Sequence, residues 1–147
     1  ALLQPEDVFV SWHDDRVLKK WVAAFMDQAE FAVGKQALDA AIKKKDIRDG
    51  TLADGSSEYH ITLASRHERT SSGEAFGAFD EFERDAKALR LSRSTPLGMG
   101  LLTQSSGNFA LMVVVDWPEL QALRQRHFLL PNYPHITVGF RDHDIHD

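Results

Sequence analysis

Two seven-residue segments of this chain repeat one another. Residues 60–66 read His-Ile-Thr-Leu-Ala-Ser-Arg, and residues 135–141 read His-Ile-Thr-Val-Gly-Phe-Arg. In a β-strand, residues i and i+2 share a face and lie about 7 Å apart. The repeat therefore predicts two similar strands, each with a polar face that carries histidine and threonine and an apolar face that packs into the core.

The polar faces of the two predicted strands are expected to converge on one cleft. Side chains at i, i+2 and i+6 share a face in a regular strand, and two strands around a pseudo-twofold axis would bring both sets together. The residues predicted to line the cleft are His60, Thr62, Arg66, His135, Thr137 and Arg141.

Paired histidines and hydroxyl groups suit chemistry at a phosphorus atom. Two imidazoles can act as general base and general acid on opposite sides of the phosphate. The hydroxyl groups of Thr62 and Thr137 can donate hydrogen bonds to the non-bridging oxygens as charge builds up. This scheme requires no metal or other cofactor. Because the two segments are equivalent, the sequence leaves open whether His60 or His135 is the acid.

The composition of the chain limits the class of ligand and the cellular compartment that suit it. The chain has 147 residues and a net charge of −5, which does not suit a protein that grips long duplex nucleic acid through many phosphates. A small nucleotide, an oligonucleotide or an RNA end remains possible as a partner, because the electrostatic field near the site, and not the net charge of the chain, steers such a ligand. The absence of cysteine is compatible with the cytoplasm, or the host cytoplasm for a viral protein, and no sequence run suggests a membrane partner.

The rest of the chain mixes helical and strand periodicities, which predicts an α+β fold. Helices are expected over residues 17–45, with a break at Gly34, over 74–91, and from Pro118 to about 127. Loops rich in turn-forming residues are expected at 49–57 and 69–73. Strands are expected at residues 8–10, 59–64, 97–102, 109–115 and 135–140.

The repeated segments resemble the two motifs of the 2H phosphoesterase superfamily. Residues 59–63, Tyr-His-Ile-Thr-Leu, resemble the first motif, and residues 132–138, Asn-Tyr-Pro-His-Ile-Thr-Val, resemble the second. A hairpin and a helix precede the second segment in the order that the superfamily has. The superfamily includes 2′,3′-cyclic phosphodiesterases, 2′,5′-oligoadenylate phosphodiesterases and nucleases that act on cyclic oligonucleotides.

The resemblance implies a fold and a set of residue roles. The fold would be one bilobal domain over residues 1–147, with two pseudo-symmetric lobes of antiparallel sheet and flanking helices around a central cleft. His60 and His135 would be the acid–base pair, and Thr62 and Thr137 would contact the phosphate. Arg66 and Arg141 are not part of the superfamily motif, and their role is inferred from spacing alone.

Other candidate residues are weaker. Tyr133 and Trp12 could stack on a nucleobase, whereas His13 and His67 are expected to be surface histidines. The chain lacks the His-x-His-x-His cluster of histidine-triad hydrolases. A metal site in the donor-rich last residues is not favoured, because chain ends are usually poorly ordered; its donors would be His143, Asp144, His146 and Asp147.

The sequence thus predicts a metal-independent phosphodiesterase, a hydrolase or nuclease with a role in RNA processing. It would cleave a cyclic phosphate or a 2′-linked or cyclic oligonucleotide by two-histidine acid–base catalysis. The alternative is a non-catalytic module that sequesters a cyclic nucleotide or an RNA end.

Overall fold

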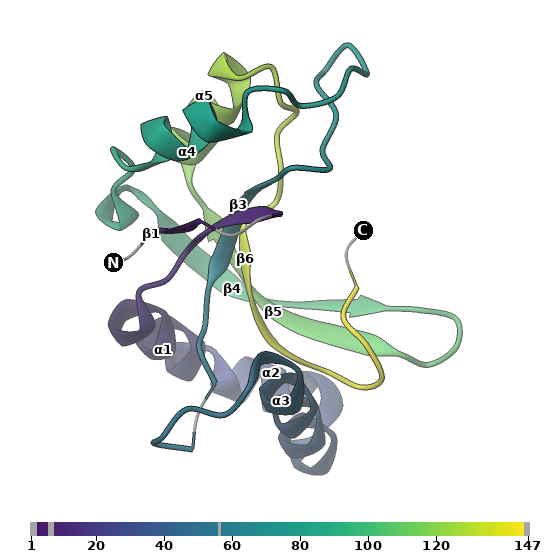
Figure 1. The fold of residues 1–147 in the computed structure, drawn as a ribbon. Coiled ribbons are helices and arrows are strands. Elements are labelled where there is room, and N and C mark those ends of the chain that lie inside the picture. The colour runs from purple at the N-terminus through teal and green to yellow at the C-terminus, as the bar shows by residue number, and fades with distance from the viewer. Residues whose placement is uncertain (1–2, 6–7, 56, 146–147) are drawn as a thin grey trace.

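Two three-stranded antiparallel sheets form the framework of the protein (Figure 1). The structure is a computed structural model that describes residues 3–5, 8–55 and 57–145. The first sheet has the order β1 (Leu3–Pro5), β2 (Phe9–Trp12), β3 (Ile61–Ser65). The second has the order β4 (Thr95–Thr103), β5 (Phe109–Asp116), β6 (His135–Phe140). Each repeated segment thus lies at an edge of its own sheet.

Five α-helices accompany the sheets within the described residues, so the predicted α+β class is confirmed. They are α1 (Asp15–Ala24), α2 (Met26–Val33), α3 (Lys35–Asp49), α4 (Phe79–Ala86) and α5 (Pro118–Arg126). The side chain of Asp14 accepts a hydrogen bond from the backbone N–H of Val17 and caps α1. Gly34 separates α2 from α3 with a φ of 86°, as its place in the sequence predicts. The break between α1 and α2 at Phe25 is not predicted by the sequence.

The helices gather at two ends of the molecule (Figure 1). At one end, α3 packs on β6 and α2 packs on β4, so that these helices cover the second sheet. At the other end, α4 and α5 pack against one another. None of the helices in the described ranges is long and apolar enough to cross a membrane.

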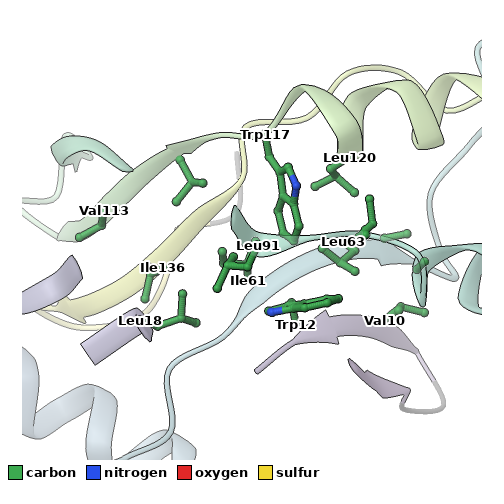
Figure 2. Packing of buried hydrophobic residues seen from close by; sticks show 14 of the residues in the cluster. Val10, Trp12, Leu18, Ile61, Leu63, Leu91, Val113, Trp117, Leu120 and Ile136 are labelled. Carbon is green, nitrogen blue, oxygen red and sulfur yellow. The ribbon is translucent and has the colours of Figure 1, made fainter. Parts of the chain in front are cut away.

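One hydrophobic core joins both sheets (Figure 2). Its centre holds Trp12 of β2 and Trp117, whose rings meet edge to face with centroids 5.7 Å apart. The isoleucines of the two repeats, Ile61 and Ile136, are both fully buried in this core. Side chains alternate along a strand, so the burial of Ile61 and Ile136 directs the histidine and threonine on either side of each isoleucine to the opposite face, away from the core.

Both motif strands contain a β-bulge at the same place in the repeat. In the first sheet Val10 pairs with Ala64 and Ser11 pairs with Thr62, which leaves Leu63 without a partner. In the second sheet Leu111 and Met112 pair with Gly139 and Thr137, which leaves Val138 without a partner. Leu63 and Val138 occupy the fourth position of their segments. A bulge adds one residue and redirects the side chains that follow it.

Gly139 of β6 packs against the backbone of α3. A Cβ atom at this position would lie 2.6 Å from the carbonyl carbon of Ala41 and 2.9 Å from the backbone nitrogen of Ile42. Backbone atoms cannot move aside as a flexible side chain can, so any larger residue would push α3 away from the sheet. This close approach accounts for glycine in the second repeat where the first has Ala64.

Gly139→Ala is therefore expected to lower the free energy of unfolding by about 1–3 kcal/mol through overpacking. Urea unfolding followed by circular dichroism measures this loss. The matched control is Gly77→Ala, because a Cβ atom at Gly77 would meet no heavy atom within 4 Å. Equal unfolding midpoints for the two variants would show that α3 does not press on β6 as described.

Candidate active site

The two motif strands contact one another across the boundary between the sheets (Figure 1). One cavity of about 1030 Å³ opens beside them, just above the range of about 300–1,000 Å³ that is usual for ligand sites. The histidines and threonines of both repeats line it: His60, Thr62, His135 and Thr137. The chain therefore brings the four residues of the repeat together around one space.

A buried lysine anchors the segment that leads into the first motif. The side chain of Lys45, from α3, is 1% exposed, and its Nζ donates hydrogen bonds to Ser57 Oγ and to the carbonyl oxygen of Glu58. The same nitrogen lies 3.3 Å from a carboxylate oxygen of Asp49 and 4.3 Å from the centre of the Tyr59 ring. The residues just before His60 are thus held to α3.

The segment before the second motif is fixed from α5. The side chain of Gln121 exchanges two hydrogen bonds with Asn132, at 2.8 and 3.0 Å. The Nδ1 atom of His135 lies 2.9 Å from the carbonyl oxygen of Tyr133. A carbonyl oxygen only accepts, so Nδ1 of this ring carries a proton and Nε2 is left for a ligand.

Arg124 of α5 links both motif segments. Its side chain is 2% exposed, and its guanidinium donates to the carbonyl oxygen of Leu63, the bulged residue, at 2.8 Å. It also donates to the carbonyl oxygen of Leu130 at 2.8 Å and to both carboxylate oxygens of Glu68. One side chain thus ties the end of β3 to the segment that leads to His135.

The pKa of His60, the histidine of the first motif, is strongly lowered. Burial disfavours its charged form and, together with the nearby His13, lowers the pKa of His60 from 6.5 to about 4. Asp49 opposes this shift, whereas Lys45 and Arg48 add to it. His60 is therefore an uncharged imidazole at neutral pH, with a lone pair able to accept a proton.

The model of the Swiss Army Knife 2H phosphoesterase domain matches residues 20–146 of this chain. The chain belongs to the 2H phosphoesterase family. Comparisons with curated proteins and with solved structures gave no match. Membership indicates phosphodiesterase chemistry on nucleotide-type substrates, as the paired His-x-Thr segments predict.

The prediction that two arginines face the cavity is corrected by the structure of this 2H phosphoesterase. Arg66 follows the end of β3 and lies over the ring of Phe79 at 4.2 Å, with Asp80 at 3.8 Å. Arg141 follows the end of β6 and donates to the carbonyl oxygen of Gly107 at 3.0 Å. The bulges explain both positions, because one added residue shifts the alternation of faces before the arginine at the seventh position of each segment is reached.

The two aromatic candidates have different positions. Tyr133 lines the cavity and its side chain is 87% exposed, so its ring can meet a ligand. Trp12 is 6% exposed and packs against Trp117 in the core, so its prediction as a ligand contact is wrong. Alternation along β2 is the reason: Phe9, Ser11 and the following His13 line the cavity, whereas Trp12 faces the opposite side.

The expectation that His13 is a surface histidine is wrong. Its side chain is 11% exposed, it lines the cavity, and its ring is stacked on that of His60 with centroids 5.3 Å apart. The available signal was the alternation of β2, which places residue 13 on the face of Phe9 and Ser11. His67, the other histidine considered, is exposed and outside the described cavity lining.

The donor-rich C-terminal residues are only partly described. His146 and Asp147 lie outside the described residues. Asp144 lines the cavity and forms an ion pair with Arg48 at 2.8 Å, and Nδ1 of His143 lies 2.9 Å from the carbonyl oxygen of Asp144. Within the described part of the chain, no group of three or more candidate ligands is arranged to hold a metal ion.

Proposed function

We propose that this protein is a metal-independent phosphodiesterase that hydrolyses a 2′,3′-cyclic phosphate. The observation that carries the proposal is the convergence of both His-x-Thr pairs on one cavity. We further propose that residues 1–147 form a single bilobal domain with a pseudo-twofold relation between its halves. The corresponding strand orders and the matched bulges at Leu63 and Val138 support that relation.

The proposed reaction is a direct hydrolysis. One histidine takes a proton from water, the water oxygen forms a bond to phosphorus, and the bond to one ribose oxygen breaks. The other histidine gives its proton to that leaving oxygen, so protons and charge balance. The hydroxyl groups of Thr62 and Thr137 donate to the non-bridging oxygens and stabilise the charge that develops there.

The surroundings of the two histidines favour one assignment of roles. His60 is uncharged at neutral pH, so it is suited to accept the proton of water. His135 keeps a proton on Nδ1 through the carbonyl oxygen of Tyr133, so its Nε2 can carry and deliver a second proton. We therefore assign His60 as the general base and His135 as the general acid.

The charges around the cavity favour a substrate with one phosphate. Among the described residues that line it, those with a fixed charge are Arg48, Asp49, Glu58, Glu68 and Asp144. Four carboxylates and one guanidinium would repel an oligonucleotide more strongly than a single phosphodiester. Phe9, 42% exposed, and the exposed ring of Tyr133 give aromatic faces for a base. A cyclic mononucleotide, or an RNA end of which only the terminal phosphate enters the cavity, fits this lining better than a 2′,5′-linked or cyclic oligonucleotide.

The experiment is a hydrolysis assay in excess EDTA with 2′,3′-cyclic mononucleotides, 2′,5′-oligoadenylate and cyclic di- and trinucleotides. We expect many turnovers of the cyclic mononucleotides by the wild-type protein and none by the His60→Ala/His135→Ala double variant. For kcat/KM, activity should rise with pH through about 4, where His60 loses its proton. The sequence alone suggested that this ionisation lies near neutrality.

The same assay separates the enzyme from a sequestering module. A module would bind a nucleotide tightly and release it unchanged on denaturation, with no more than one ligand consumed per protein. Faster turnover of the cyclic oligonucleotides than of the mononucleotides would contradict the argument from the charged lining.

A further inference from the structure

His13 and His60 lie opposite one another at the end of the first sheet, one residue beyond the last pair of β2 and β3. Trp12 pairs with Ile61 in the register of β2 and β3, so the next residues of the two antiparallel chains, His13 and His60, oppose one another. Their rings are stacked at 5.3 Å between centroids, with 24° between the ring planes. Both side chains line the cavity.

The second sheet has an apolar residue at the corresponding place. In the register of β5 and β6, Val114 pairs with His135. Val114 is thus the counterpart of His13, and it also lines the cavity. The two motif histidines, alike in sequence, therefore face different neighbours: an imidazole in one half and an isopropyl group in the other.

A carboxylate, that of Glu58, lies beside the ring of His13. The Nδ1 atom of His13 lies 2.9 Å from a carboxylate oxygen of Glu58, although neither ring nitrogen meets the geometry of a hydrogen bond within the described residues. The other charged groups that act on His60 come from α3: Asp49 favours its protonated form, whereas Lys45 and Arg48 oppose it. The neighbour at stacking distance is His13.

We propose that His13 is a positioning residue that makes the two motif histidines unequal, so that His60 accepts a proton in the reaction and does not donate one. Its ring covers one face of His60 and fixes that imidazole by stacking. Two imidazolium rings this close would repel one another, so the ring of His13 disfavours the charged form of His60. The role in turnover rests on the proposed function, whereas the coupling of the rings does not.

The test compares three variants by NMR titration of the His60 ring. His13→Val gives the first half the residue that the second half has at Val114, and His13→Phe keeps a stacked ring without a charge. His67→Val is the control, because His67 is exposed and outside the cavity lining. In the wild-type and control proteins we expect His60 to titrate near pH 4.

Loss of both burial and repulsion in His13→Val should raise the pKa of His60 toward its ordinary value of 6.5, and His13→Phe should raise it less. If the reaction is as proposed, kcat/KM of His13→Val should fall about tenfold at pH 5 and little at pH 8, because only the neutral base is active. His13→Phe should lie between this variant and the wild type.

An unchanged His60 titration in a folded His13→Val protein would overturn the proposal, whatever its activity. An equal loss of kcat/KM at pH 5 and pH 8 would overturn it as well, since a purely structural role moves both alike. If the wild-type protein turns over no phosphodiester while the titration shifts as expected, the proposed function fails and the coupling of His13 to His60 stands.

Discussion

Alanine at His60 or at His135 should lower the rate of cyclic phosphate hydrolysis by about 10²- to 10⁴-fold, the contribution of a well-placed acid or base. Each variant removes one proton-transfer group from the cavity, while both threonine hydroxyls remain. Initial rates with a 2′,3′-cyclic mononucleotide measure the loss. Thermal unfolding of each variant shows whether the fold is intact, and His67→Ala is the control for loss of an exposed histidine.

The assignment of roles predicts a difference between the two variants. A p-nitrophenyl phosphodiester has a leaving group that needs no proton, so His135→Ala should recover much of its activity with this substrate. His60→Ala should remain impaired, because the attacking water still needs a base. Recovery by His60→Ala instead would reverse the roles, and a rate near that of the wild type in either variant would remove that histidine from the mechanism.

Arg124→Met should have the largest effect on stability, lowering the free energy of unfolding by about 3 kcal/mol or more. The substitution leaves the carboxylate of Glu68 without its cation and the carbonyl oxygens of Leu63 and Leu130 without their donor. Urea unfolding measures the loss. Arg126→Met is the matched control, because Arg126 is an exposed arginine of the same helix.

A second variant keeps this prediction testable if Arg124→Met does not fold. Arg124→Met/Glu68→Gln removes the uncompensated charge and should recover part of the lost stability, since an unpaired carboxylate is the larger cost. If Arg124→Met is as stable as Arg126→Met, the guanidinium does not hold the two motif segments together.

The motif strands were predicted well from the sequence because each has large apolar residues that must be buried on one face. The predicted strand at 135–140 coincides with β6, and that at 59–64 overlaps β3, since Ile61 and Ile136 must both reach the core. The helix start at Pro118 and the break at Gly34 were also correct, because proline and glycine restrict the backbone locally. The aromatic stripe at 74–91 predicted a longer helix than α4 (Phe79–Ala86), which leaves Phe76 buried outside it.

The errors concern features that depend on pairing between distant segments. The positions of Arg66 and Arg141 depend on bulges at Leu63 and Val138, and a bulge becomes visible only when the partner strand is known. Likewise, the stacking of His13 on His60 requires the register of β2 on β3, which the local pattern does not give.

The most direct test of the site is the crystal structure of the His60→Gln protein with a bound 2′,3′-cyclic nucleotide. We expect the phosphate to lie in the cavity beside β3 and β6. Its non-bridging oxygens should lie within hydrogen-bond distance of the Thr62 and Thr137 hydroxyl groups, with Nε2 of His135 next to an ester oxygen. A phosphate bound elsewhere, such as beside Arg141, would show that the two His-x-Thr segments do not form the substrate site.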